Sequence, residues 1–475
     1  MPALKYRALL QHTWPLLLAS LGSIVVGLVD ALLVSHYSAT AVAGVALGAA
    51  FYELGLHILL GALMAHRILA PRVQAATTES NCAGGLGTVL RTLLPAAALF
   101  AAVAIMVCLF AAPHTADPAH QAAFAYTAAR APGLVCETVT AAFTITLVAW
   151  GKTRVPVLVF ALVTPANLLL DWVLIYGVGP VPELGAFGAG LGSAISALLP
   201  MPVLLVLFFK NRDKTQDKNR ACRAVNSAET AENHNIPAID TAATIPDAAE
   251  NQAIASHHYR NWRSMARPAV ASAAADYLGS IMFALVVGTA GVAALAALRF
   301  GALLHLLAFV VISSVSTAAL YLLGRDFVRH EDALFARVTW VRRVFLLVGV
   351  VTGGLAGVLG VVLAPIVSPD AQVQADFLLA TLVVALLCPV AGACYGNVTI
   401  LRAYGRTGLE FAGNALGVWA AQLPVAVICA LVWGGISPFA GLAAYWLLRF
   451  AISRHQVQKH ILIPASSSTN PKTKK

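Results

Sequence analysis

The strongest constraint on this chain is a series of apolar blocks, each about 20 residues long, which recur from Trp14 to Phe450. A helix of that length crosses a hydrocarbon core of about 30 Å. Backbone amides in lipid need partners within the protein, and the alternation typical of barrel strands is missing, so the blocks predict helices. Only 11% of the residues are charged, whereas soluble proteins carry about 25%. We therefore expect an all-α polytopic membrane protein.

The apolar blocks predict about twelve transmembrane helices. The predicted ranges are 14–34, 41–63, 88–112, 121–150, 155–178, 185–209, 266–287, 293–323, 340–365, 374–402, 408–433 and 436–453. The first block is of full length and leads directly into a second, which is typical of a membrane span and not of a cleavable leader.

Lysine and arginine indicate the orientation of these helices. Of the 31 basic residues, 29 fall at the N-terminus, in alternate loops or in the tail, where Arg449 is counted. The other two, Arg130 and Arg299, lie within spans, and the opposite loops hold none. By the positive-inside rule both termini are cytoplasmic, so we expect a multi-pass protein of the cell inner membrane. The net charge of +10 then reflects topology, and we expect no nucleic-acid partner.

Residues 210–263 differ in composition from the rest of the chain. Most of this interval is rich in Asn, Ala, Thr, Glu and Asp and poor in large apolar residues, which is typical of a cytoplasmic linker. The linker separates a predicted N-terminal six-helix lobe at 1–209 from a C-terminal six-helix lobe at 264–453. Residues 454–475 are predicted to form a cytoplasmic tail.

The two predicted lobes resemble each other in sequence. Trp14-Pro15 before the first span corresponds to Arg267-Pro268 before the seventh, and Gly48 corresponds to Gly301. Trp150-Gly-Lys-Thr153 likewise corresponds to Tyr404-Gly-Arg-Thr407. Matches at nearly one offset indicate an internal repeat. Because each lobe has six spans, we expect two parallel bundles related by an axis along the membrane normal, with a central cleft.

Acidic residues inside predicted spans are candidates for function, because a charge in the bilayer is costly. Asp30 lies in the first span, and Asn167 and Asp171 lie four residues apart in the fifth, on one helix face. At about 1.5 Å per residue, Asp30 lies about 6 Å and Asp171 about 10 Å below the outer ends of their helices. The three side chains at similar depth are suited to bind a cation or share a proton.

Other polar residues within spans are weaker candidates, because each has a structural explanation. The set comprises Glu53 and His57 in the second span, Arg130 and Glu137 on one face of the fourth, Asp276 in the seventh and His305 in the eighth. We consider Arg130, Glu137, Asp276 and His305 as possible residues of the second lobe or the cleft. Glu53 and His57 could simply pair with each other.

Signatures of enzymes and nucleotide-driven pumps are missing from the sequence. It contains no GxxxxGK[ST], HExxH or GxSxG motif, so we expect neither an enzyme nor an organic cofactor or metal. The energy source is then expected to be an ion gradient, of protons or sodium.

The sequence resembles the multidrug and toxic compound extrusion (MATE) family of cation-coupled exporters. Asn167-Leu-Leu-Leu-Asp171 followed by the glycine-rich stretch 185–196 resembles the fifth and sixth helices of that family. Pro15 with Asp30 fifteen residues later resembles its first helix. The repeated Gly-[Lys/Arg]-Thr motif supports the match, and the resemblance covers 14–209 and 263–450.

The resemblance implies roles for particular residues. Asp30, Asn167 and Asp171 match the family's cation-coupling site in the first lobe, and Ser193 matches a position where its sixth helix often supplies a hydroxyl. Asp276 matches an acid of the second-lobe sodium site in the NorM-like branch. The stretch 387–397 in the tenth span has no carboxylate, so we expect the DinF-like branch and proton coupling.

The function expected from these observations is proton-coupled or sodium-coupled antiport. The chain would export small amphipathic or cationic compounds across the cytoplasmic membrane as a monomer. The alternatives are a lipid-linked precursor flippase of the same superfamily, a major-facilitator-type transporter, and a membrane receptor or scaffold that does not transport. The major-facilitator loop signature is missing from 65–74.

Overall fold

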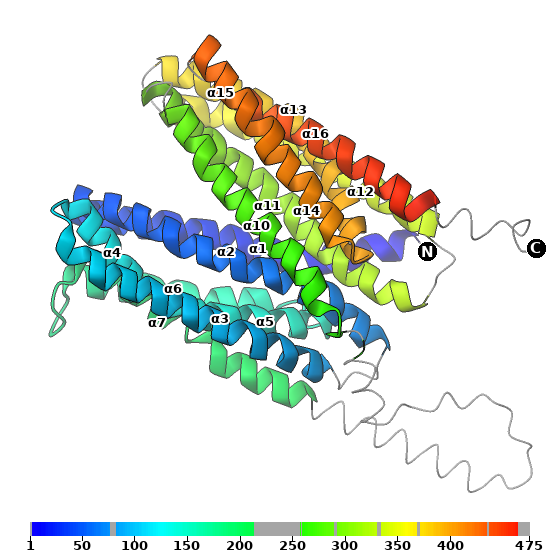
Figure 1. The fold of residues 1–475 in the computed structure, drawn as a ribbon, viewed down its shortest axis with the longest axis horizontal. Helices are drawn as coiled ribbons and strands as arrows, with labels where there is room; N and C mark the ends of the chain where they lie inside the picture. The colour runs from blue at the N-terminus through cyan, green and yellow to red at the C-terminus, as the bar shows by residue number, and fades with distance from the viewer. Residues whose placement is uncertain are drawn as a thin grey trace, which may run out of the picture. The chain divides into compact units, whose positions relative to one another are not determined.

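The computed structural model describes residues 2–76, 82–212, 257, 259–288, 292–329, 334–367, 371–434 and 437–463. These residues form helices and connecting turns, with no strand among them (Figure 1). The helices of the N-terminal part are α1 (Pro2–Tyr37), α2 (Ala39–Ala76), α3 (Cys82–Ala111), α4 (Pro118–Arg130), α5 (Gly133–Ala149), α6 (Val155–Tyr176) and α7 (Gly185–Ser196). Those of the C-terminal part are α10 (Trp262–Gly288), α11 (Val292–Arg329), α12 (Leu334–Val367), α13 (Ala371–Ala403), α14 (Thr407–Ala415), α15 (Leu423–Val432) and α16 (Ala440–Val457).

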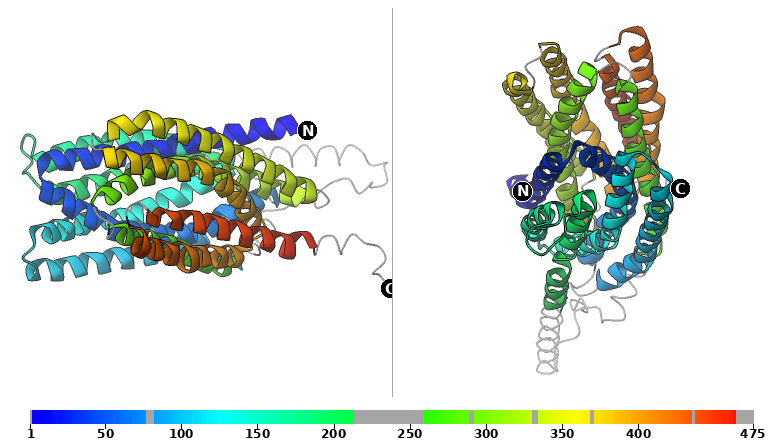
Figure 2. Two further views of the ribbon diagram at one scale, coloured as in Figure 1. Left: turned by 90° about the horizontal axis from the view of Figure 1, so that it is seen from above. Right: turned by 90° about the vertical axis from the view of Figure 1, so that its left-hand side faces the viewer.

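The predicted spans correspond to these helices. Among the described residues, 9 helical stretches are long and apolar enough to cross a membrane, and up to 10 if the bent pair of α4 and α5 counts as one span. α1 and α16 occupy the two remaining predicted ranges. Two further views show the same all-helical construction (Figure 2). The predicted all-α polytopic class is confirmed.

The predicted fourth span, 121–150, is not one continuous helix. α4 ends at Arg130, α5 begins at Gly133, and the two are bent by 46°. Pro132 lies at the break, and a proline lacks the amide hydrogen that a helix interior needs. The prediction that Arg130 and Glu137 share one helix face is therefore wrong, since they lie on two helices.

The described residues form two compact units. The N-terminal unit comprises Gly22–Ser264 and Gly324–Arg329, and the C-terminal unit comprises Met1–Leu21, Met265–Leu323 and His330–Lys475. The lobe, linker and tail boundaries predicted from sequence remain a prediction. Most of the predicted linker, 213–256, lies outside the described residues, as does the side chain of Arg299.

The repeated Gly-[Lys/Arg]-Thr motif forms the same turn in both units. Gly151 and Gly405 have positive φ angles of 83° and 71°, which favour glycine. In each turn the next amide bonds back five residues, from Lys152 to Leu147 at 2.9 Å and from Arg406 to Leu401 at 2.8 Å. Both are Schellman-type helix ends, and the short turn directs the chain into the next helix.

Apolar side chains on the outside of the helices indicate where lipid covers the protein. Leu355, Val358 and Val362 on α12 are 66%, 66% and 58% exposed, and Phe110 on α3 is 74% exposed. Such stripes along helices of membrane length would associate in water, whereas hydrocarbon covers them.

One charge is placed differently from the sequence prediction, which counts Arg449 with the cytoplasmic tail. α16 continues to Val457 and buries Arg449, which is 2% exposed. The residue is therefore a cation inside a helical bundle, where a charge needs partners.

Candidate functional site

The helix that carries the predicted acid and amide is held firmly at both ends. α6 begins at Val155, directly after the Gly151 turn, and ends at Tyr176. The next residue, Gly177, has a φ of 68° and caps the helix by donating its amide hydrogen to the Val173 backbone oxygen. Between these ends Asn167 and Asp171 lie one turn apart on the buried face, 4% and 1% exposed. The four-residue spacing therefore brings both polar groups into the interior of the N-terminal unit.

Asn167 joins the two acids. Its side-chain nitrogen donates to Asp30 Oδ1 at 3.1 Å and to Asp171 Oδ2 at 2.8 Å. An amide nitrogen carries two hydrogens, so each carboxyl group receives one. The Asp30 and Asp171 carboxyl groups also lie within hydrogen-bonding reach of each other. The structure thus brings the three predicted residues together from α1 and α6.

The acceptor side of Asn167 is held by α7. Ser196 Oγ donates to Asn167 Oδ1 at 3.0 Å, which fixes the direction of the amide. Ser193, the predicted hydroxyl, is buried on the same helix, and its backbone oxygen accepts a bond from Ser196 Oγ at 2.9 Å. The hydroxyl that contacts the trio therefore comes from Ser196, which the sequence reasoning missed although it ends the same glycine-rich stretch.

Asp171 lies against the backbone of α7. A methyl group added at Gly192 would overlap Asp171 Oδ1, so glycine is needed for this close approach. Asp171 Oδ1 is buried and accepts no hydrogen bond from the described nitrogen or hydroxyl donors. A buried carboxylate oxygen without a donor is costly. The atom therefore identifies where a proton or cation would be most stabilising.

Arg130 provides the positive charge nearest to the two acids. Its Nη2 forms an ion pair with Glu137 Oε1 at 3.0 Å across the break between α4 and α5, and its guanidinium lies 4.6 Å from the centre of the Tyr52 ring. The charge of Arg130 also acts on Asp30 and Asp171. Arg130 thus pairs with Glu137 across the bend at Pro132, and its charge still acts on the two acids.

The remaining predicted residues lie elsewhere. His305 is half-buried, with its ring 6.1 Å from Trp446 and 6.2 Å from Phe309, and lines a small apolar pocket. Glu53 and His57 are exposed on α2, and the His57 ring bonds to the backbone oxygen of Glu53 at 2.7 Å. Within the described chain, the hydrogen bonds that hold the Asn167 amide involve none of these three residues.

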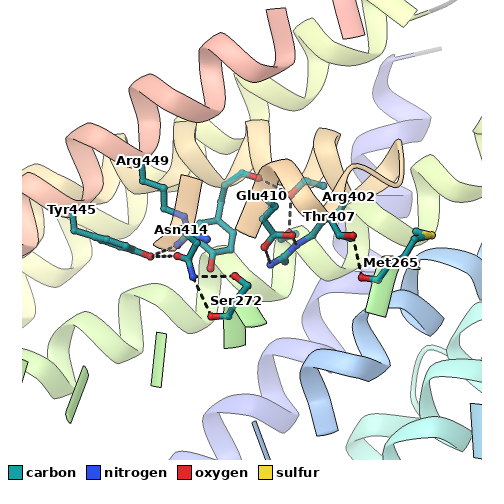
Figure 3. A network of polar contacts seen from close by, with 11 residues as sticks. Met265, Ser272, Arg402, Thr407, Glu410, Asn414, Tyr445 and Arg449 are labelled. Atoms are coloured by element: carbon teal, nitrogen blue, oxygen red, sulfur yellow. Dashed lines mark hydrogen bonds and ion pairs between the residues drawn. The ribbon is translucent and has the colours of Figure 1, made fainter. Parts of the chain in front are cut away.

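A second polar cluster, in the C-terminal unit, was mostly missed by the sequence reasoning; it includes Arg402, Glu410, Asn414 and Arg449 (Figure 3). The charges of Arg402, Glu410 and Arg449 act on Asp276. The Asp276 side chain is half-buried on α10, one turn after Ser272, whose hydroxyl accepts from Asn414 Nδ2 of α14 at 3.0 Å. Glu410 and Asn414 share one face of α14 at a four-residue spacing, the same signal that identified Asn167 and Asp171. Within the described residues no group of three His, Cys, Asp or Glu side chains is arranged to hold a metal ion.

Comparison with known proteins extends these observations. Residues 15–173 match the family model MatE. Two proteins described as "Probable multidrug resistance protein NorM" are similar in sequence. The one from Aromatoleum aromaticum is 31% identical over 193 residues, which is 39% of this chain and 41% of that protein. The one from Geobacillus kaustophilus is 29% identical over 203 residues, 40% and 43% of the two chains.

Solved structures show similarity over nearly the whole length. A mutant of the Vibrio cholerae MATE transporter VcmN matches with a TM-score of 0.73 at 17% identity, covering 97% of this chain and 99% of that chain. The eukaryotic MATE transporter AtDTX14 matches with a TM-score of 0.71 at 12% identity, covering 98% of each.

These comparisons differ in what they establish. The family model matches within the first lobe, and the match to the curated relatives spans less than half the length of each. The structural match extends over nearly the whole chain and shows the fold of MATE transporters, which replaces the major-facilitator alternative. The predicted resemblance to the MATE family is confirmed, while the matched relatives carry the name NorM and do not resolve the NorM-like and DinF-like branches.

Proposed function

We propose that this chain of the MATE family is an ion-coupled antiporter that exports small amphipathic or cationic compounds, and that protons drive it through Asp30, Asn167 and Asp171. The observation that carries the proposal is the Asn167 amide, which bridges the half-buried Asp30 carboxyl group on α1 and the buried Asp171 carboxyl group on α6 at 3.1 Å and 2.8 Å. The relatives named as multidrug resistance proteins support the substrate class.

The arrangement favours a proton over a metal cation. Two carboxylates in contact in a buried site repel each other, and one proton shared between them removes that repulsion. Asp171 Oδ1 lacks a donor among the described residues and is the position where such a proton would complete the hydrogen bonding. The DinF-like assignment belongs to this proposal, because it rests on proton coupling in the first lobe.

Proton binding would change how α1 packs against α6. In the protonated state Asp30, Asn167 and Asp171 hold the two helices together, with Tyr176 Oη also donating to the Leu33 backbone oxygen at 2.7 Å. Loss of the proton leaves two like charges side by side, which favours separation of the helices. A difference in proton affinity between two arrangements is what allows a gradient to drive one toward the other.

The proposal places the protein in the cell membrane as a monomer, with both termini cytoplasmic and with the lobes divided at 210–263. The lipid-linked flippase of the same superfamily would share this fold. It differs in its substrate, so the experiment that follows includes both substrate classes.

The test is flux in proteoliposomes with a proton or a sodium gradient imposed separately, using a panel of cationic dyes and a lipid-linked sugar. We expect proton-driven dye export that Asp171→Asn abolishes and Asp30→Asn nearly abolishes, with insertion and folding retained. Asp276→Asn should keep partial activity, and Asp117→Asn, at an exposed acid outside the spans, serves as the matched control. Normal export by Asp171→Asn together with loss in Asp276→Asn would assign coupling to the other unit.

A further inference from the structure

Four charged side chains lie inside the C-terminal unit, and the proposed function uses none of them; Figure 3 labels three of the four, Arg402, Glu410 and Arg449. Arg402 comes from α13, Glu410 from α14, Arg449 from α16 and Asp276 from α10. Glu410 and Arg449 are 4% and 2% exposed. Buried charges destabilise a helical bundle unless they are paired, so each of these groups needs a partner.

Arg402 and Glu410 satisfy each other. Arg402 Nε donates to Glu410 Oε2 at 2.9 Å, and Arg402 Nη2 forms a second bond to Glu410 Oε1. This fork geometry is the strongest form of an arginine–carboxylate pair. The pair is therefore neutral and leaves the charges of Arg449 and Asp276 to be accounted for.

Arg449 is held among aromatic rings. Its guanidinium carbon lies 5.3 Å, 5.4 Å and 5.8 Å from the ring centres of Tyr445, Tyr395 and Trp446. Its Nη1 donates to the Tyr445 hydroxyl, while its Nε has no hydrogen-bond partner among the described residues. Ring faces attract a cation but do not neutralise it, so this arginine still needs an anion.

Neutral side chains connect Arg449 to the helix of Asp276. The Tyr445 hydroxyl accepts from Arg449 and donates to Asn414 Oδ1 at 3.0 Å. Asn414 Nδ2 in turn donates to Ser272 Oγ at 3.0 Å and to the Ser272 backbone oxygen at 3.2 Å, and Asp276 lies one turn further along the same helix, α10. The charged groups that act on Asp276 are Arg449, Glu410 and Arg402. With the last two paired, Arg449 is the cation left to balance Asp276.

The backbone is adapted to this chain of contacts. A π-helical segment, Leu416–Gln422, directly follows α14, and π-bulges are frequent at functional sites. Within it, a methyl group on Gly417 would lie 2.9 Å from Tyr445 Cδ2, so the tyrosine ring packs directly on the backbone. The position of the Tyr445 hydroxyl between Arg449 and Asn414 is therefore fixed by packing.

We propose that Arg449 is the built-in counter-ion of Asp276, linked to the helix of that acid through Tyr445, Asn414 and Ser272, and that it keeps sodium out of the C-terminal unit. With Arg449 in place the four charges sum to zero, and an added metal cation would leave an unbalanced buried charge. Without Arg449 the cluster carries one excess negative charge, which a sodium ion would balance. Arg449 is thus a residue that determines ion specificity.

The first test is rescue by a second neutralisation, measured as monodisperse yield and thermal midpoint in detergent. Arg449→Met should lose most of its folded protein, and Asp276→Asn added to it should restore most of the loss, whereas Glu410→Gln should not. Arg402→Met is the matched control and should show the opposite pattern, with rescue by Glu410→Gln. Failure of Asp276→Asn to rescue Arg449→Met, or equal rescue by Glu410→Gln, would overturn the pairing.

The second test is equilibrium binding of radioactive sodium to the purified full chain at alkaline pH. We expect no saturable binding that depends on Asp276 in the unmodified protein, saturable binding in Arg449→Gln, and its loss in Arg449→Gln with Asp276→Asn. Sodium binding to the unmodified protein that Asp276→Asn removes, or none in a folded Arg449→Gln protein, would overturn the specificity claim. The proposal that Arg449 excludes sodium rests on the proposed function, because that function assigns ion coupling to the N-terminal unit. Binding in detergent involves no flux, so its failure is distinct from a failure of proton-driven export.

Discussion

Both units bury an asparagine amide among charged groups, and they use it differently. In the N-terminal unit Asn167 joins two acids, and the nearby cation Arg130 is paired with Glu137. In the C-terminal unit Asn414 lies between Ser272, one turn before Asp276, and the tyrosine that binds Arg449. The first cluster is short of positive charge and the second is balanced. Under the proposed function, a driving proton acts on the first cluster, and the second cluster is structural.

The largest effects are expected from removing each amide. Asn167→Leu deletes two hydrogen bonds to acidic groups, worth about 1.5–3 kcal/mol each, and should reduce proton-driven export at least about tenfold while the protein stays folded. Asn414→Leu should instead lower the thermal midpoint, because it removes the amide that joins Tyr445, the partner of Arg449, to Ser272 on α10. Flux and thermal unfolding of both variants provide the measurement. A purely structural effect of Asn167→Leu, with full coupling in the surviving protein, would remove the contrast.

The sequence predicts one of these clusters far better than the other. Asn167 and Asp171 are four residues apart, so helical periodicity alone places them together, and a single acid in the first span completes the trio. The contacts of the other cluster join distant segments, as from Asn414 to Ser272, 142 residues apart. Arg449 falls near the end of the last predicted span, 436–453, but nothing local in the sequence shows that it is buried, because its surroundings come from α13 and α16 together.

Two smaller differences between the sequence predictions and the structure depend on how neighbouring helices pack. The break at Pro132 could be predicted from the proline, but the ion pair across it depends on the bend between α4 and α5. Ser193 and Ser196 lie on the same glycine-rich helix, and which hydroxyl reaches Asn167 depends on how α7 rotates against α6. The apolar blocks were sufficient to predict the helices themselves.

Intermediate effects are expected from filling the glycine contact in each unit. Gly192→Ala places a methyl group against Asp171 and should weaken proton coupling, at a cost of about 1–3 kcal/mol. Gly417→Ala places a methyl group against the Tyr445 ring and should lower the free energy of unfolding by a similar amount. Gly87→Ala on α3 meets no atom within 4 Å and is the neutral control. The readouts are the pH dependence of dye export and the thermal midpoint. If Gly192→Ala behaved like Gly87→Ala, the close approach to Asp171 would have no functional meaning.

The smallest effect is expected at an acid outside both clusters. Asp117 caps α4 by accepting from the Ala119 amide at 2.9 Å, and His120 lies 2.6 Å from its other oxygen. These contacts hold the pKa of the Asp117 carboxyl below its ordinary value. Its stabilising contribution is present above the ordinary pKa and is lost as pH falls through the lowered one. Asp117→Ala should therefore lower the thermal midpoint slightly at neutral pH, and the difference should vanish in acid. A difference that persists in acid would point to packing and not to charge.

Proton release on substrate binding tests the central claim most directly. Purified protein in weakly buffered detergent, followed with a pH indicator dye, should release protons when a cationic substrate is added. We expect that release to disappear in Asp171→Asn and to persist in Asp276→Asn, because only the first unit holds a site short of positive charge among the described residues. Undiminished release from a substrate-binding Asp171→Asn protein, or loss of release in Asp276→Asn alone, would contradict the account.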